Sequence, residues 1–218
     1  MKALVIGATG ATGRDLVQQL LGDENFTEVH LFVRRTVSLR HEKLVLHIVD
    51  FEQPQKWAHL VSGDAAFSCM GTTLKAAGSK AAQWKVDHDY QYDFAKAASA
   101  NRVGVYVLVS SAGADPASRF FYLRMKGHLE QAVASLDFQS ILIFQPGPLE
   151  RPDSDRLGER IGIGVIRLFN KLGLFRNHKP VPTAVLSKAM IKCVKSIGQG
   201  IFRFNTADIF SQAKMLIK

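Results

Sequence analysis

Short apolar runs alternate with longer amphipathic segments along the 218 residues of the chain. The apolar runs are nearly continuous and rich in Val, Ile, Leu and Phe, a pattern typical of strands that are covered on both faces. Such strands are predicted at Ala3–Ile6, Val29–Val33, Val45–Val49, Ala65–Ser68, Val105–Val109 and Gln139–Phe144. Helices are predicted between them at Thr12–Leu21, Trp84–Ala100 and Ser118–Ala134. This alternation indicates right-handed crossovers, and therefore an α/β fold with a doubly wound parallel sheet.

The pattern changes after Pro146, where Gly and Pro become frequent. A basic and apolar segment follows at 156–179, and a last helix is predicted at Thr183–Ile197. We expect residues from about 150 to 218 to form a small C-terminal cap on a single domain that spans 1–218. The basic segment is expected to be a mobile lid over the substrate, because its glycines argue against one rigid helix. The alternatives are a helix at a membrane surface and a docking site for an acidic partner.

Composition and charge narrow the class of protein. The net charge of +9 favours anionic partners, but the basic residues do not gather into a run with interleaved aromatics, so nucleic-acid binding is not expected. No apolar run reaches the roughly 18 residues of a membrane span, and the apolar N-terminus is too short for a signal peptide. Cys69 and Cys193 are far apart, and the seven histidines lack ligand spacing. We therefore expect a reducing compartment, no metal and a cytoplasmic location.

The first predicted strand runs directly into the sequence GATGATGR at residues 7–14. In a loop between a strand and a helix, one glycine accepts a positive φ, a second lets the backbone approach a pyrophosphate, and a third lets the helix pack closely. The pyrophosphate then lies at the positive end of the helix dipole. The spacing predicts a dinucleotide site in a Rossmann-type fold, with contacts from Gly7, Thr9, Gly10, Ala11, Thr12, Gly13 and Arg14.

The end of the second predicted strand indicates which dinucleotide is bound. An acidic residue at this place would bind the ribose 2′-hydroxyl of NAD, but the chain has Arg34 and Arg35 there. Arginine suits a 2′-phosphate, because its guanidinium makes paired, charge-assisted hydrogen bonds to phosphate oxygens. We therefore expect NADP as the cofactor, with NAD as the alternative. Asp50, at the end of the third strand, is placed either to meet the adenine or to stabilise a surface turn.

A tyrosine and a lysine stand four residues apart in the segment FFYLRMKG at 120–127. Residues i and i+4 share one face of a helix, so Tyr122 and Lys126 would be neighbours. The preceding strand ends in Ser110 and Ser111, at the sheet edge where a doubly wound fold binds its ligands. A nearby ammonium is expected to bring the tyrosine pKa, ordinarily about 10, toward neutrality for acid–base catalysis. Ser111 would orient a substrate oxygen, with Ser110 as the alternative.

With these motifs, the chain resembles the atypical short-chain dehydrogenases/reductases, in particular the Tat-interacting oxidoreductase-like branch and its bacterial relatives. The resemblance is carried by the glycine loop and by VRR at 33–35, VDFE at 49–52, CMGTT at 69–73, VDHDY at 86–90, VSSAGAD at 109–115, YLRMKG at 122–127 and FQPGPL at 144–149. It implies a catalytic group of Ser111, Tyr122 and Lys126. It also implies cofactor contacts from Arg34 or Arg35, Asp50, Phe51, Gly71, Thr72, Ser110, Lys126, Pro146 and Gly147.

The sequence therefore predicts an NADP-dependent oxidoreductase that transfers hydride between the nicotinamide and a small carbonyl or alcohol substrate. The alternative is an NADPH-binding regulatory protein that acts on a partner protein, because the resemblance includes relatives known for interactions rather than reactions. Two positions depart from the family pattern. Gln145 stands where many members have Arg before the Pro-Gly pair, and Asp87 stands where extended members have Asn in the helix.

Overall fold

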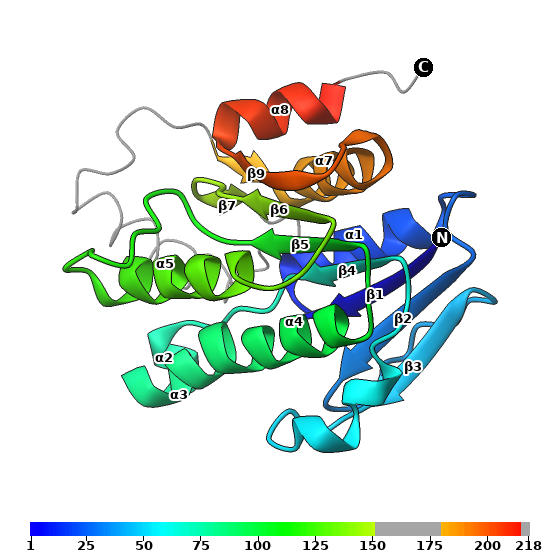
Figure 1. Ribbon diagram of the computed structural model, residues 1–218, viewed down its shortest axis with the longest axis horizontal. Helices are drawn as coiled ribbons and strands as arrows, with labels where there is room; N and C mark the ends of the chain where they lie inside the picture. The colour runs from blue at the N-terminus through cyan, green and yellow to red at the C-terminus, as the bar shows by residue number, and fades with distance from the viewer. Residues whose placement is uncertain (151–179, 215–218) are drawn as a thin grey trace.

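The computed structural model describes residues 1–150 and 180–214, so the basic segment expected to form a lid at 156–179 lies outside the described residues. Seven parallel strands form one sheet in the order β3-β2-β1-β4-β5-β6-β9 (Figure 1). Their bounds are Lys2–Ile6 (β1), Glu28–Val33 (β2), Leu44–Ile48 (β3), Ala65–Ser68 (β4), Val105–Val109 (β5), Ser140–Phe144 (β6) and Gly200–Phe204 (β9). The expected doubly wound Rossmann-type sheet is confirmed.

Helices cover both faces of this sheet. One layer consists of α1 (Ala11–Leu21), α7 (Thr183–Ser196) and α8 (Thr206–Lys214). The opposite layer contains α4 (Tyr90–Ala100) and α5 (Phe121–Ala134). Figure 1 shows α4 and α5 on one side of the strands and α7 and α8 on the other. None of the helices in the described part of the chain is long and apolar enough to span a membrane.

Two apolar cores result, because successive residues of a strand face opposite sides of the sheet. In β1, Val5 belongs to the core under α1 and α7, whereas Leu4 and Ile6 belong to the core under α4 and α5. All three side chains are fully buried. Burial on both faces explains why the strands have nearly continuous apolar sequences, the pattern from which they were predicted.

Short elements complete the described chain. The segment between β3 and β4 contains 3₁₀ turns, the segment after β4 contains two short helices and a π-helix, and a two-stranded parallel sheet lies beside the main one. These elements are Pro54–Lys56, Ala58–Leu60, α2 (Leu74–Ala77), α3 (Lys80–Trp84), the π-helix Lys85–Asp89, β7 (Leu149–Glu150) and β8 (Val181–Pro182).

Three elements differ from the predictions. The helix expected over Trp84–Ala100 is divided, because the π-helix Lys85–Asp89 comes between α3 and α4. The helix expected from Ser118 begins at Phe121, since Phe120 has the extended conformation of an N-cap residue. The C-terminal part supplies β9, which pairs with β6 and extends the main sheet. The division into a domain and a cap stays a prediction.

The strand order determines where a ligand can bind. From β1 the chain adds β2 and β3 on one side, and it then crosses back to add β4 on the other side of β1. The order of the strands therefore reverses between β1 and β4. In open α/β sheets, ligands bind at the carboxyl ends of the strands at this switch point. The loops that leave β1 to β6 contain most of the residues selected from the sequence, and the others lie in the first turns of α1 and α5.

Candidate functional site

The glycine loop has the geometry of a close-packed phosphate cradle. Gly7 has a φ of +75°, and a Cβ atom there would lie 2.5 Å from the backbone of Cys69 and Met70. A Cβ at Gly13 would overlap the carbonyl oxygen of Gly7. The Gly10 amide donates to the same carbonyl over 3.0 Å and closes the turn. The loop fits a dinucleotide, because space requires glycine at both Gly7 and Gly13, and the positive φ also favours glycine at Gly7.

Helix α1 begins at Ala11 without a side-chain cap and without an acidic residue in its first turn. Thr9 and Gly10 are exposed in front of it, which leaves the positive end of the helix dipole open to an anion. Arg14 adds a positive charge, and its Nε donates to the Thr9 carbonyl over 3.0 Å. Thr12 is buried, and its carbonyl accepts from the Ser187 hydroxyl over 3.2 Å; its contact with a cofactor stays a prediction.

Arg34 and Arg35 directly follow β2 and are both exposed. Burial and the hydrogen bond to Glu52 raise the pKa of Tyr90 to about 12, and the charge of Arg34 acts in the opposite direction. Arg34 therefore lies close enough to Tyr90 for its charge to act on the phenol. Tyr90 in turn stacks on Phe51 after β3, with ring centroids 5.5 Å apart.

The residues after β3 are engaged within their own turn. The Asp50 carboxylate accepts hydrogen bonds from the Glu52 amide over 3.0 Å and the Gln53 side chain over 2.7 Å. These bonds lower the pKa of Asp50. Phe51 is buried and also packs against Trp57. Both arrangements stabilise the turn, and adenine contacts from this pair stay a prediction.

The loop after β4 brings Gly71 and Thr72 to the same edge of the sheet. The Thr72 amide donates to Asp87 Oδ1 over 2.8 Å, and the Thr72 carbonyl accepts from Gln83 over 3.3 Å. Gly71 is exposed and lies against the Asp87 carboxylate, where an added Cβ would be 3.4 Å from Oδ1. The π-helix therefore determines the position of this loop through a buried carboxylate.

The three residues expected to form the catalytic group come together at the carboxyl end of β5. The Ser111 hydroxyl donates to the Ala112 carbonyl over 3.3 Å, and it lies close enough to Tyr122 on the first turn of α5 to act on the pKa of that phenol. Lys126, one turn later, is only 3% exposed, and its Nζ donates to the Val109 carbonyl over 3.4 Å. Ser110 points elsewhere and donates to the buried carboxylate of Glu130. The geometry distinguishes the two serines: Ser111 faces the tyrosine and Ser110 does not.

The protonation of this group differs from the sequence expectation. Burial and the negative charge of Asp87 raise the pKa of Tyr122, and the hydrogen bond with Ser111 only partly opposes them. Burial lowers the pKa of Lys126, while the charges of Asp87 and Glu130 raise it. This direction is opposite to the expected shift of the tyrosine pKa toward neutrality, because burial and Asp87 outweigh the effect of Ser111.

Sequence reasoning missed a buried carboxylate that organises the neighbouring strand ends. Glu130 accepts from Ser110 after β5, from Gln145 after β6 over 3.0 Å to each oxygen, and lies 3.6 Å from Nε of Arg203 on β9. Gln145, one of the two departures from the family pattern, is thus a hydrogen-bond donor to Glu130. The sequence contained an indication of this role, because Tyr122, Lys126 and Glu130 are each four residues apart and therefore lie on the same face of α5.

Pro146 and Gly147 are buried and join this edge of the sheet through their backbone. The Pro146 carbonyl accepts from the Ala112 amide over 2.9 Å, and the Gly147 amide donates to the Thr206 hydroxyl over 3.0 Å. The first bond ties the loop after β6 to the residue that follows Ser111. Pro146 therefore supports the loop that carries Ser111, Gly147 connects the loop after β6 to α8, and cofactor contacts from both stay a prediction.

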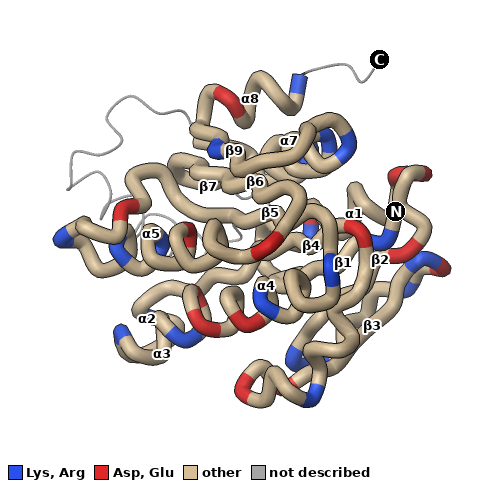
Figure 2. Tube along the Cα trace, viewed as in Figure 1, with Lys and Arg blue, Asp and Glu red and all other residues tan. Residues whose placement is uncertain are grey.

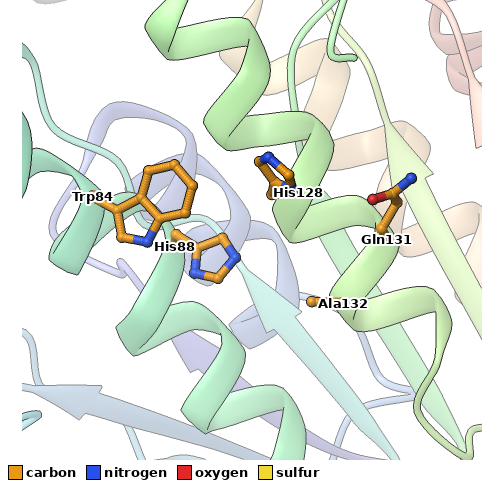
Figure 3. Close-up of a pocket in the computed structure, with 5 residues that line it drawn as sticks. All are labelled: Trp84, His88, His128, Gln131 and Ala132. Atoms are coloured by element: carbon orange, nitrogen blue, oxygen red, sulfur yellow. The ribbon is translucent and has the colours of Figure 1, made fainter. Parts of the chain in front are cut away.

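A separate hollow of about 510 Å³ lies between the end of α3 and α5. Figure 3 shows Trp84 and His88 facing His128, Gln131 and Ala132 of α5 across it. None of the predicted site residues lines this hollow. Within the described residues, no group of three or more His, Cys, Asp or Glu is arranged to hold a metal ion.

Comparison with curated proteins identifies relatives over most of the chain. The mitochondrial protein FMP52 of Saccharomyces cerevisiae is 38% identical over 164 residues, which are 72% of this chain and 71% of that protein. The protein HTATIP2 of Rattus norvegicus is 34% identical over 202 residues, 90% of this chain and 82% of that protein. The expectation of a cytoplasmic location is contradicted, because the FMP52 relatives are named mitochondrial. Unpaired cysteines indicate only a reducing environment, which the cytoplasm shares with other compartments.

Solved structures and a family match complete the assignment. MoeE5 in complex with UDP-glucuronic acid and NAD has a TM-score of 0.70 at 16% identity, over 94% of this chain and 76% of that one. A short-chain dehydrogenase/reductase superfamily protein from Agrobacterium tumefaciens with bound NAD gives the same score and identity, over 94% and 77%. At this identity the likeness concerns the fold. Residues 7–150 match the NAD(P)H-binding family. The chain therefore belongs to the NAD(P)H-binding proteins of the atypical short-chain dehydrogenase/reductase family.

Proposed function

We propose that this protein is an NADP-dependent oxidoreductase that reduces a small carbonyl substrate. The observation that carries the proposal is the grouping of Ser111, at the end of β5, with Tyr122 and the buried Lys126 on the first turns of α5. This group lies at the carboxyl edge of the sheet, where the loops after β1 and β4 also end. A binding protein without turnover has no need of an acid–base group beside its cofactor.

Each residue has a role that follows from its surroundings. When bound, the nicotinamide cofactor supplies the hydride for reduction. Tyr122 holds its proton at neutral pH, because burial and Asp87 raise its pKa, so it donates that proton to the carbonyl oxygen. Ser111 orients the oxygen by hydrogen bonding, and the positive charge of Lys126 stabilises the phenolate that remains.

The preference for NADP rests on Arg34 and Arg35. Both are exposed at the end of β2, where no acidic residue is present to bind a ribose hydroxyl. Arg34 is the main candidate for the 2′-phosphate, because its charge reaches Tyr90, which stacks on Phe51 at the end of the next strand. Gly7, Gly10 and the first amides of α1 would hold the pyrophosphate.

Two linked measurements test this function. Fluorescence titration should give a lower Kd for NADPH than for NADH, and NADPH absorbance should fall when a panel of aldehydes and ketones is added. Tyr122→Phe should abolish the absorbance change and leave NADPH binding intact. Tyr92→Phe on α4 is the matched control and should keep full activity. Tight NADPH binding without turnover of any carbonyl, together with NADPH-dependent capture of a partner protein, would instead support the regulatory alternative.

A further inference from the structure

Two histidines on neighbouring strands are joined directly through their rings. Nδ1 of His30 on β2 lies 2.8 Å from Nε2 of His47 on β3, and Nε2 of His30 lies 2.7 Å from the Glu28 carboxylate. Lys2 on β1 extends this row, because its Nζ lies 3.7 Å from the same Glu28 oxygen. His30 is buried, whereas Glu28 reaches solvent. The row therefore crosses three strands and encloses His30 between a carboxylate and a second imidazole.

The hydrogen bonds of this row determine how many protons it can hold. The hydrogen bond from His30 and the charge of Lys2 lower the pKa of Glu28, so its carboxylate is an acceptor at neutral pH. Nε2 of His30 must then carry a proton. The contact between the two rings holds one more, donated either by His47 to a neutral His30 or by a charged His30 to His47. Two protons there would place two N–H groups against each other at 2.8 Å. The geometry therefore admits at most one excess proton on the pair.

The surroundings of His47 also oppose a second charge. Burial first, and then the charges of His30 and Lys2, lower the pKa of His47 from its ordinary value of 6.5. In the described part of the chain, these two residues are the cations that act on His47. A second proton is therefore taken up only in acid. It must separate the two rings, because like charges and two facing donors repel each other.

His47 is also a packing residue, so its displacement would be felt in the core. Its ring stacks on Phe32 with centroids 4.7 Å apart, and Phe32 in turn contacts Trp57 at 6.3 Å. Nε1 of Trp57 donates to the Asp50 carbonyl over 2.8 Å, and its ring packs against Phe51. Asp50 and Phe51 form the turn after β3 that is expected to contact adenine. A continuous series of contacts thus leads from the two histidines to that turn.

We propose that His30 and His47 form a one-proton switch, in which a second proton expels His47 from its place and loosens the turn at Asp50 and Phe51. With one excess proton or none, the pair holds β3 against β2. β3 suits this role because it lies at the end of the sheet, where Ile48 is 59% exposed. The consequence is a cofactor site that weakens in acid, and only this consequence rests on the proposed function.

Titration of the histidine rings by ¹⁵N NMR, from about pH 8 to below about pH 5, tests the switch. The His47 signals are assigned by their loss in His47→Gln. In the wild type, the His47 midpoint should lie below 6.5. In His30→Gln it should rise by about one pH unit, the lower range for removal of a neighbouring like charge. His88→Gln, which removes a histidine from the separate hollow, is the matched control and should leave the His47 midpoint unchanged.

Trp57 reports whether the core follows the switch. The chain has two tryptophans, so Trp84→Phe leaves Trp57 as the one fluorophore of this kind. Its emission should change over the same pH range as the protonation of His47. The change should be much smaller when His30→Gln is added, because a charged His47 can then donate to the glutamine oxygen and keep its place. The Kd for NADPH should rise over the same range.

An unchanged His47 midpoint in His30→Gln, or Trp57 emission that does not follow His47, overturns the switch. If His30→Gln does not fold, the wild type decides, because Nε2 of His30 must stay protonated throughout the titration. An unprotonated Nε2 of His30 at neutral pH overturns the switch equally. The NMR and fluorescence readouts need neither cofactor nor turnover. A protein that fails to bind NADPH at neutral pH would therefore refute the proposed function and not the switch.

Discussion

The packing of the glycine loop against β4 makes a quantitative prediction for Gly7→Ala. Gly7 has a φ of +75°, and its added Cβ would lie 2.5 Å from two backbone atoms of Cys69 and Met70. Left-handed backbone costs a residue with a side chain about 1–2 kcal/mol. Backbone atoms cannot rotate away as a side chain can, so overpacking adds about 1–3 kcal/mol. The free energy of unfolding should therefore fall by about 2–5 kcal/mol.

Gly78→Ala separates the two contributions. Gly78 also has a positive φ, of +83°, but no heavy atom lies within 4 Å of its added Cβ. It should lose only the backbone contribution, about 1–2 kcal/mol. Urea unfolding followed by circular dichroism measures both variants, and NADPH titration should show weaker binding for Gly7→Ala alone. If Gly7→Ala is no less stable than Gly78→Ala, the close approach of the loop to the end of β4 is wrong.

Three further predictions concern the site and the pH dependence of stability. Ser111→Ala should lower carbonyl turnover by at least about 100-fold while NADPH binding is kept, as for loss of one transition-state hydrogen bond. Ser110→Ala should instead lower the free energy of unfolding by about 1–3 kcal/mol, because the buried carboxylate on α5 loses a donor; equal kinetic effects of the two variants would contradict their assignment. Arg34→Ala should raise the Kd for NADPH by about tenfold or more, the effect of losing one charge-assisted contact, and leave the Kd for NADH unchanged. A parallel rise in both constants would remove Arg34 from 2′-phosphate recognition. Burial alone would raise the pKa of Asp23, but hydrogen bonds, first that from Lys195, lower it below its ordinary value of 3.8. A lowered folded-state pKa contributes stability above the unfolded value, and this contribution is lost as pH falls through the folded value. Asp23→Asn should therefore lower stability at pH 6 and flatten the loss of stability below about pH 4, as measured by urea unfolding across this range. An unchanged acid slope would refute this role.

The strands were predictable because burial on both faces produces nearly continuous apolar sequences, and the glycine loop was predictable from the spacing of its glycines. β4 and β5 have the predicted bounds Ala65–Ser68 and Val105–Val109, since both lie in the middle of the sheet with apolar neighbours on each face. The strand β9 was not predicted. It lies at the sheet edge, where Ile201 is 46% exposed and Arg203 faces Glu130, so its apolar pattern is broken.

Other features depend on contacts between distant segments. The π-helix Lys85–Asp89 is a single turn between two helices, so it is too short for its own periodicity to be recognised in the sequence. The pairing of Asp87 with the Thr72 amide is visible only in the structure. The pKa of Tyr122 was misjudged for the same reason, because the sequence suggests the lysine beside it but not the carboxylate across from it. Figure 2 shows basic and acidic positions interspersed along the described chain, a distribution that the net charge alone does not reveal.

The central claim is hydride transfer from NADPH to a carbonyl carbon with Tyr122 as the proton donor, and isotope transfer tests it most directly. NADPH carrying deuterium at the transferable position is incubated with the protein and the carbonyl panel, and the alcohol products are analysed by mass spectrometry. The account predicts an alcohol one mass unit heavier with the wild type and with Tyr92→Phe, and none with Tyr122→Phe. Deuterated product at the wild-type rate from Tyr122→Phe would contradict it.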